Sequence, residues 1–473
     1  MKKSASLIDQ PKDKLFYETF LLATIIVLLP SRALGYIVPF ICLLWYVIRG
    51  HSGKVFRLII LSALVFLLVI FFYWSIYSYV GINFLVSNSI VSLITHGSLL
   101  FILLVRGSFI TSNYSYDKFA TVLNYAVLIQ GLVGIVQFLA VSLTNRFDIL
   151  PGDAVQGTIG LFAFVSGVAG FGNQMFAINM VFFLVFLAPS VLKNRKRLLS
   201  FSIGLISLMF AGVLHVFIAL IFSTLVTLFL FRKNLVFSNL GKLVVAVILA
   251  GLLILPLGTI FPDVFKTANV FITLYQNLDS PKFHIVDRTV NDMTKEYPYV
   301  YLIGLGPGQY LSRAGLMSSG KYLDRPIPLL SNTMSEPFQK YAFQTWNSYS
   351  TNSDRFGAST MHRPYFSMLS IFAEFGLVGL LLLLTYLIIL MARMRKTYLY
   401  YRRNHENQSA YLCFATGLLL IFLFSISFFD NYLETTQAIF PGLLLLSAFY
   451  RYLRERASLR ASFVAQPHAN QLA

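Results

Sequence analysis

The sequence predicts an all-α protein that crosses a membrane many times and carries a large helical segment outside it. Hydrophobic residues make up 57% of the 473 residues and charged residues 12%, whereas a soluble domain carries about 25% charge. The mean hydropathy is +0.72. These values exclude a soluble globular domain and a disordered chain, and they leave a polytopic membrane protein.

Apolar runs predict twelve membrane spans, since a helix needs about 20 apolar residues to cross a bilayer. Several runs are shorter than this, so paired half-length hairpins and tilted segments are alternatives. The first run follows a basic N-terminus and lacks a small-residue cleavage site, which favours a retained span over a signal peptide. The predicted spans are 15–29, 34–48, 56–73, 87–105, 119–141, 174–192, 198–211, 213–231, 242–260, 365–392, 410–428 and 435–450.

The distribution of Lys and Arg predicts that both termini are cytoplasmic, because cytoplasmic loops are enriched in these residues. With the N-terminus inside, 25 of the 37 basic residues lie in cytoplasmic segments, and the short outer loops hold only Arg32 and Arg146. The other ten lie in the outer segment 262–364, which is too long for an unstructured connection. We therefore expect this segment to fold as a helical cap. The cytoplasmic loops then explain the net charge of +18, so this charge does not indicate a nucleic-acid partner.

Four parts follow from this topology: spans 1–9 in residues 1–261, the cap in 262–364, spans 10–12 in 365–450, and a cytoplasmic tail in 451–473. The sequence contains no GxxxxGK[ST], HExxH, CxxC or DxD pattern, and Cys42 and Cys413 lie within apolar runs. We therefore expect no cofactor and a metal-free chemistry in which Arg and His handle any phosphate.

The first candidate stretch is HIVDRTVNDMTKEYPYVYLIGLGPGQY (284–310), which predicts a helix followed by a glycine-rich turn. Arg288 either pairs with Asp292 on the helix surface or makes bidentate contacts with a diphosphate. Gly306 and Gly308 either form only a turn or bring backbone N–H groups near an anion.

The second candidate stretch, MHRPYFSMLSIFAEFGLVGLLLLL (361–384), opens the tenth span. His362 and Arg363 precede Pro364 at a helix N-terminus, which favours anions. A neutral His362 there suits a base and Arg363 an anion ligand; the alternative is an interfacial histidine and a snorkelling arginine. Glu374 is expected about 18 Å deeper, where an ionisable residue is either functional or, as preferred here, a protonated, hydrogen-bonded structural residue.

Other polar residues lie within or beside the predicted spans. Arg32, on the outer side, contacts a lipid headgroup or anchors the chain at the interface. The remaining ones, interpreted as hydrogen-bonded packing residues, are His96, His215, Asn173 and Gln174.

Together these features resemble the O-antigen polymerase and O-antigen ligase family of Gram-negative inner membranes. The family pattern is small-Gly-x-Gly, then His-Asn-x-x-Leu, then Glu-x-Gly-x-x-Gly; the corresponding strings here are GLGPGQY, HRPYFSML and EFGLVG. GVAGFGNQMFAINM (167–180) is similar to the family's approach to a middle span. The family often has Ser-Arg between two middle spans, where this chain reads FAGVLHVF, and Arg363 replaces the Asn. The second departure favours a polymerase over a ligase.

The resemblance implies a GT-C-like fold and a metal-independent inverting glycosyltransferase with a periplasmic active site. Its donor is an undecaprenyl-diphosphate-linked glycan, its acceptor is a glycan, and its other partners are the lipid bilayer and a chain-length regulator protein. His362 and Arg288 are the implied catalytic residues. Those implied to bind the diphosphate or substrate are Arg363, Gly306, Gly308 and Arg32.

Three functions remain open at this point. The preferred one is polymerisation of lipid-linked repeat units, and the second is a ligase that transfers the glycan to lipid A-core. The third, a transporter of glycans or solutes, is disfavoured by the long outer segment and by the absence of half-to-half symmetry in the sequence.

Overall fold

The computed structural model describes ten stretches of the chain: 10–29, 32–50, 53–104, 113–144, 151–161, 172–238, 262–277, 280–320, 333–352 and 363–469. Within these stretches the regular structure is helical and no strand occurs, which confirms the all-α fold class. In a bilayer each backbone N–H and C=O must be satisfied within the protein, and a helix does this inside one segment.

In the described stretches, twelve helices follow the apolar runs. Six of them are long and apolar enough to cross a membrane, and a bent pair, α4 with α5, makes a seventh if the two count as one span. The protein is therefore a multi-pass membrane protein. The helices are α1 (Gln10–Val27), α2 (Arg32–Gly50), α3 (Gly53–Val80), α4 (Val86–Thr95), α5 (Gly97–Leu104), α6 (Asn113–Thr144), α9 (Gly172–Lys193), α10 (Leu198–Phe210), α11 (Leu214–Ser238), α19 (Ser367–Arg403), α20 (Asn407–Ile426) and α21 (Thr436–Ala469).

Some predicted spans differ in shape from a simple crossing helix. The run 87–105 forms α4 and α5, which meet at His96 with a bend of 65°. The run 198–211 forms α10, whose 13 residues reach only about 20 Å against a hydrocarbon core of about 30 Å. The predicted span 242–260 lies outside the described residues. The number twelve therefore stays a prediction.

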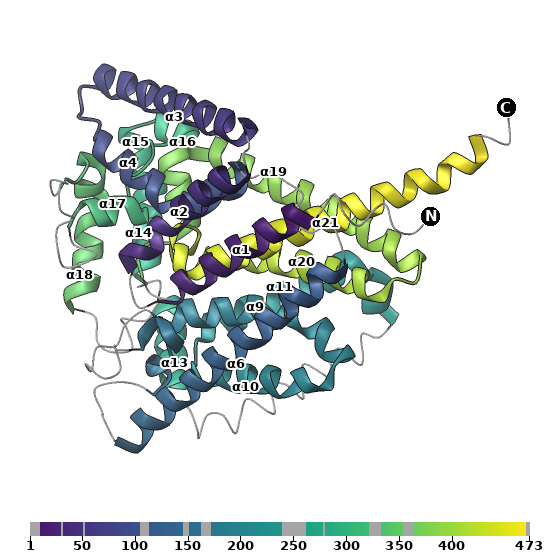
Figure 1. Cartoon of the computed structure of the whole chain (residues 1–473). Helices are drawn as coiled ribbons and strands as arrows, with labels where there is room; N and C mark the ends of the chain where they lie inside the picture. Colours follow the sequence, from purple (N-terminus) through teal and green to yellow (C-terminus); the bar gives the residue numbers. More distant parts are fainter. Residues whose placement is uncertain are drawn as a thin grey trace.

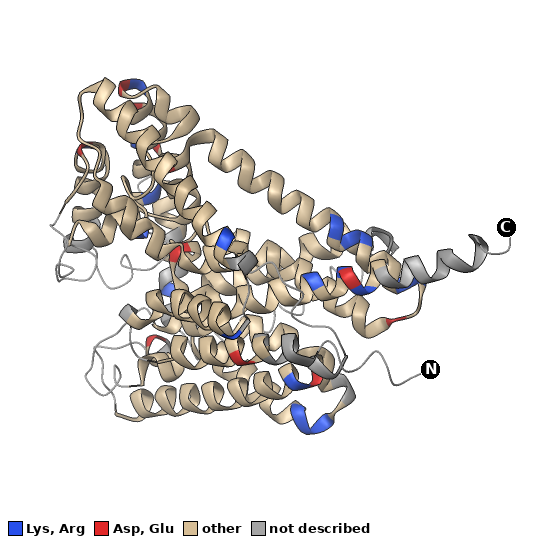
Figure 2. Ribbon diagram, turned by 45° about the horizontal axis from the view of Figure 1, so that its top comes forward, with Lys and Arg blue, Asp and Glu red and all other residues tan. Residues whose placement is uncertain are grey.

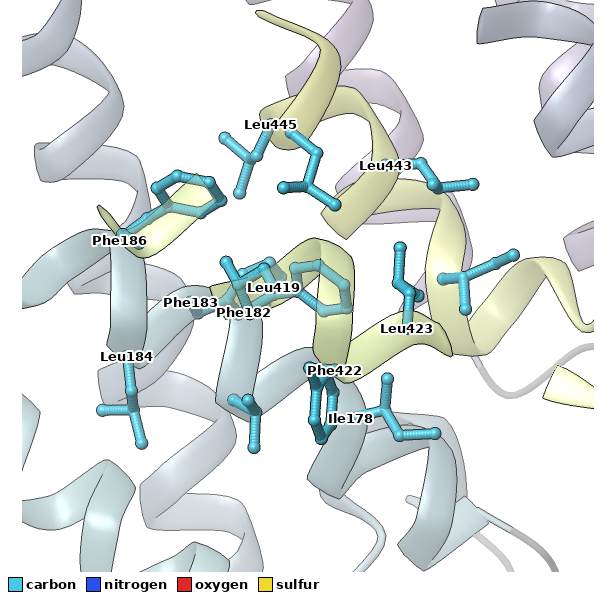
Figure 3. Close-up of a cluster of buried hydrophobic side chains, with 14 of the residues drawn as sticks. Ile178, Phe182, Phe183, Leu184, Phe186, Leu419, Phe422, Leu423, Leu443 and Leu445 are labelled. Atoms are coloured by element: carbon cyan, nitrogen blue, oxygen red, sulfur yellow. The ribbon is translucent and has the colours of Figure 1, made fainter. Parts of the chain in front are cut away.

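The main hydrophobic core lies between α9, α20 and α21. Helix α9 is apolar around its whole circumference, which is the pattern of a helix buried on all sides. Its aromatic side chains pack into the other two helices (Figure 3), with the rings of Phe182 and Phe422 6.0 Å apart. Gly442 on α21 allows this approach, because a Cβ there would lie 2.6 Å from the Phe182 ring.

The segment predicted as a cap folds, in its described parts, into short helices. Buried side chains of 281–320 and 333–352 form a second core, separate from the first, together with Tyr77, Tyr365 and Leu369. The short helices are α13 (Pro262–Gln276), α14 (Pro281–Asp287), η3 (Arg288–Met293), α15 (Thr294–Glu296), α16 (Tyr299–Ile303), α17 (Arg313–Ser318), η4 (Phe338–Phe343) and α18 (Gln344–Asn352).

The two ends of the chain lie away from these short helices. Helix α1 begins, and α21 ends, toward the side of the molecule opposite α14–α18 (Figure 1). Lys and Arg gather near the same end, in the C-terminal part of α19 and in η2 (Arg195–Arg197) (Figure 2). This arrangement agrees with the charge pattern from which the topology was predicted.

Candidate functional site

Five buried ionisable side chains meet where the short helices contact the ends of α19, α20 and α21. They come from α14, from α17, from the segment four residues before α19, and from the connection between α20 and α21, which includes η5 (Tyr432–Glu434). All are at most 7% exposed. Ionisable groups buried this deeply in a membrane protein are functional candidates by default. We call them the charge cluster: Lys282, Arg313, Arg363, Asp430 and Glu434.

Asp430 is the centre of the charge cluster. Its carboxylate pairs with Nη1 of Arg363 through Oδ2 and with Nη2 of Arg313 through Oδ1, the latter at 3.4 Å. The backbone N–H of Asn431 donates to Oδ1 at 2.6 Å. Burial alone would raise the pKa of Asp430, but the two guanidinium groups outweigh it and hold that pKa below its ordinary value. Asp430 is therefore a carboxylate at neutral pH, shared by two cations.

Glu434 and Lys282 are held mainly by backbone groups. The N–H of Arg313 donates to Oε2 of Glu434, and burial raises the pKa of Glu434 to about 8. Nζ of Lys282 donates to the carbonyl oxygens of Phe428 and Phe429 at 3.1 and 2.7 Å, just beyond the end of α20. Burial lowers the pKa of Lys282 to about 7.

The charge cluster carries an excess of positive charge at neutral pH. Two guanidinium groups share one carboxylate, Glu434 is mostly protonated, and Lys282 is partly charged. A buried excess of this kind favours an anionic ligand, because planar guanidinium groups bind phosphate in bidentate fashion.

The N-terminal end of α19 is tied to the same connection. The N–H groups of Ser367 and Met368 donate to the carbonyl oxygens of Asp430 and Ser427, both at 3.3 Å. The first N–H groups of this helix are thus used within the protein. The expected affinity of the helix N-terminus for anions therefore rests on the Arg363 side chain and not on these backbone groups.

A chain of uncharged polar groups continues from the charge cluster into the main core. The Tyr432 hydroxyl donates to Oε1 of Gln174 at 3.0 Å and lies 2.6 Å from Nε2 of His215. The His215 ring also stacks on the Tyr432 ring and lies against Phe429. The interpretation of His215 and Gln174 as separate packing residues was therefore incomplete, since Tyr432 joins them.

The glycine-rich turn, residues 304–310, is held by Glu374. The N–H groups of Gly308 and Tyr310 donate to the Glu374 carboxylate at 2.8 and 3.2 Å, and the N–H of Gly306 donates to the Glu374 carbonyl at 2.8 Å. Glu374 was correctly interpreted as structural, but its expected remoteness from the outer segment was wrong. The turn reaches down to α19 and docks on it.

The glycines of both strings are required by this docking. Gly376 interrupts α19 with φ +65°, and a Cβ there would lie 2.2 Å from the carbonyl oxygen of Leu302. A Cβ on Gly308, φ +76°, would lie 2.2 Å from the carbonyl oxygen of Asn88. A Cβ on Gly304, φ +77°, would lie 2.2 Å from the backbone of Glu374, so GLGPGQY and EFGLVG are two halves of one contact. Because the N–H groups of Gly306 and Gly308 are donated to Glu374, they do not offer an anion the cradle that the sequence suggested.

The other predicted site residues lie in different surroundings. Arg363 belongs to the charge cluster. Arg288 is half-buried at the start of η3, and among the described residues no ion pair joins it to Asp292 or to a member of the charge cluster. Arg32 is the first residue of α2, but its side chain is outside the described part, and His362 lies outside the described residues altogether.

Sequence reasoning missed four members of the charge cluster. Lys282 and Arg313 were counted only as charges of the outer segment, and Asp430 and Glu434 were not considered. A signal existed for the two acids: they fall within DNYLETTQ, between two apolar runs, in a chain with only 19 Asp and Glu. Within the described part no group of three or more His, Cys, Asp and Glu residues is placed to hold a metal ion.

An apolar groove of about 550 Å³ lies between α3 and α19. Tyr73 lines the groove beside the glycine-rich turn, and its hydroxyl donates to the carbonyl oxygen of Ile303 and lies 3.3 Å from that of Glu374. Outer helix α3 packs little against the rest of the molecule (Figure 1), and most of its apolar side chains are exposed. The groove is lined by Val65, Leu68, Val69, Phe72, Tyr73, Ile303, Ile371, Phe375, Val378, Gly379 and Leu382.

Comparison of the sequence with protein-family models and with curated proteins gives no match. The resemblance to the polymerase and ligase family therefore rests on the order and spacing of the short strings. The contact between two of those strings is consistent with their occurring together, but it concerns structure and not activity.

Proposed function

We propose that this protein is an inner-membrane, metal-independent, inverting glycosyltransferase that polymerises undecaprenyl-diphosphate-linked oligosaccharide repeat units. The observation that supports this best is the buried, cation-rich charge cluster, whose member Arg363 follows His362 in the sequence. A diphosphate leaving group needs positive charge, and fixed cations in a water-poor site stabilise developing charge without reorganisation. Arg363 and its neighbours supply that charge here.

The proposed reaction has three coupled changes. The acceptor hydroxyl oxygen attacks the anomeric carbon of the donor sugar, its proton passes to a base, and the bond from the anomeric carbon to the diphosphate breaks with its electron pair. Arg363 stabilises the departing diphosphate. Arg288 binds the donor at a second point, and the resemblance assigns the base to His362.

We assign the groove between α3 and α19 to the polyprenyl chain of the donor. On α3 the groove runs from Val65 to Tyr73, about 12 Å, and on α19 from Ile371 to Leu382, about 16 Å. A hydrocarbon chain along it lies parallel to the helices. The end at Tyr73 adjoins the glycine-rich turn, which leads within a few residues to Arg313, so the headgroup end of the donor faces the charge cluster.

Filling the groove tests this assignment. Val69→Trp is expected to raise the KM for the lipid-linked donor at least severalfold, because the indole occupies the space of the chain. Leu67→Trp is the matched control, since Leu67 is 59% exposed on α3 and does not line the groove. Equal KM values for the two variants would contradict the assignment.

A polymerase is preferred to a ligase because the position after His362 is Arg363 and not the Asn of the family pattern. Glycolipid analysis of a deletion strain separates the two functions. Loss of a polymerase leaves single repeat units on the carrier or on lipid A-core and no long chains. Loss of a ligase leaves long polymer on undecaprenyl diphosphate and bare lipid A-core, and that outcome would replace our proposal.

A further inference from the structure

The groove between α3 and α19 changes in depth along its length. Beside the glycine-rich turn its wall includes Tyr73, which is only 5% exposed. Farther along, Val65 on α3 is 50% exposed and Leu382 on α19 is 68% exposed. The groove is therefore deep next to the turn and open at its other end.

The open end of the groove lies at the depth of the hydrocarbon core. Helix α3 crosses the membrane as the candidate span Phe56–Val80. Val65 is an interior residue of this span, about 13 Å from one end and about 22 Å from the other. A hydrocarbon chain that follows the groove away from Tyr73 therefore leaves it into the interior of the bilayer.

The length of the groove limits how much of a polyprenyl chain it holds. An isoprene unit adds four carbon–carbon bonds of about 1.5 Å each to the chain, so it spans at most about 5 Å. The groove is about 12 Å long on α3 and about 16 Å long on α19, which is enough for about three units. An undecaprenyl chain has eleven units, so most of it must lie outside the groove.

The units outside the groove add little to the binding of the donor. Lipid tails are as apolar as the groove, so a hydrocarbon gains no hydrophobic free energy by moving from the bilayer into it. Binding of the chain then depends on van der Waals contacts with the groove walls. Only the units that lie between α3 and α19 make these contacts.

We propose that the groove recognises only the first isoprene units of the donor, about three counted from the diphosphate. The protein then accepts a lipid-linked repeat unit on a polyprenyl chain of any greater length. This inference rests on the proposed function and defines its substrate class, which is wider than undecaprenyl diphosphate. The deep end beside Tyr73 binds the units nearest the diphosphate, and the rest of the chain stays in the bilayer.

A series of donors tests the length of chain that is recognised. Full-length protein in proteoliposomes receives the same repeat unit, linked through diphosphate to two, four, seven or eleven isoprene units. Donor is expressed as its mole fraction in the membrane, so that different partitioning does not affect KM. We expect a higher KM for two units and KM values within about twofold of one another from four to eleven units. A KM that keeps falling beyond four units would overturn the inference, because the chain would then be recognised outside the groove.

Narrowing the open end should separate long chains from short ones. In the double variant Val65→Trp with Leu382→Trp, indole rings narrow the groove from both walls, beyond the reach of two isoprene units from Tyr73. KM should rise at least severalfold for the eleven-unit donor and stay unchanged for the two-unit donor. The matched control is Leu64→Trp with Leu381→Trp, since both leucines are 53% exposed on the same helices and do not line the groove.

The comparison of two donors on one preparation does not depend on how much of the variant folds, because KM is independent of the amount of active protein. If turnover of the two-unit donor is too slow to follow, its inhibition constant against the eleven-unit donor gives the same comparison. Equal increases for both donors, or equal KM values for the double variant and its control, would overturn this inference and leave the proposed function intact. Wild-type protein that extends none of the donors would overturn both.

Discussion

Asp430→Asn is the substitution with the largest expected effect on folding. Asparagine keeps the shape of the side chain but removes the charge that Arg313 and Arg363 share. The side chains of these pairs are 3% and 1% exposed for Arg313–Asp430, and 4% and 1% for Arg363–Asp430, so water cannot replace the lost partner. Removing one partner of a buried ion pair costs about 3–5 kcal/mol, a large part of a typical total stability of about 5–15 kcal/mol.

The two buried cysteines provide the assay. Cys42 and Cys413 are the only cysteines of the chain and are both buried, so a thiol-reactive fluorophore reports their exposure on heating. The midpoint of Asp430→Asn is expected to fall far below that of the wild type. Glu296→Gln is the control, because the Glu296–Lys340 pair has side chains 36% and 52% exposed and should contribute little. Equal, small shifts for both variants would refute the claim that Asp430 holds two buried cations.

Three further predictions concern the glycine-rich turn, Lys282 and the topology. Gly308→Ala should lower the unfolding midpoint strongly, because the added Cβ would lie 2.2 Å from a backbone oxygen of α4. Gly81→Ala is the control: Gly81 also has a positive φ, +81°, but lies in open space, so its midpoint should fall much less. A larger fall for Gly81→Ala than for Gly308→Ala would contradict the docking of the turn. The folded pKa of Lys282, about 7, lies below its unfolded value of about 10.4, so the unfolded state binds more protons between these values and stability gains from Lys282 as pH rises. The midpoint difference between wild type and Lys282→Met, followed by circular dichroism, should therefore grow in favour of the wild type from pH 7 to 9.5, and a constant difference would exclude this effect. Asn291→Cys should react with an impermeant thiol reagent from the periplasm and Asn404→Cys only after the inner membrane is permeabilised, and the opposite pattern would invert the topology.

Hydropathy was sufficient to predict the helices but not their interruptions. Apolar runs marked α3, α6, α9 and α20 because backbone hydrogen bonding leaves an apolar segment in lipid few alternatives to a helix. The break of α19 at Gly376 depends on contact with a segment about 70 residues earlier in the chain, so no local sequence pattern predicts it.

In the candidate site, too, single residues could be predicted from the sequence, but their partners from distant segments could not. Arg363 was predicted from its place at the start of a span. Its partner Asp430 lies 67 residues away, and Arg313 lies 117 residues from Asp430. Such pairs arise from the packing of α17, α19 and the α20–α21 connection. Periodicity and composition describe single elements, so they carry no information on these pairs.

The glycine strings illustrate how a correct pattern can receive the wrong role. Gly306 and Gly308 do need glycine, because both have positive φ, and both of their N–H groups do donate to oxygen acceptors. For Gly308 the acceptor is the side-chain carboxyl group of Glu374, for Gly306 it is the backbone carbonyl of Glu374, and neither N–H is left for a bound diphosphate. The sequence could not distinguish an acceptor in the chain from a bound ligand, since both use the same backbone geometry.

The most direct test of the central claim is extension of a single lipid-linked repeat unit by the purified protein in proteoliposomes. With undecaprenyl-diphosphate-linked unit as the sole glycan, we expect a ladder of products that differ by one repeat. Arg363→Ala should lose the ladder, while Arg197→Ala, at the opposite, basic end of the molecule, should keep it. Wild-type protein that leaves the unit unextended, or that extends it equally well without Arg363, would contradict the account.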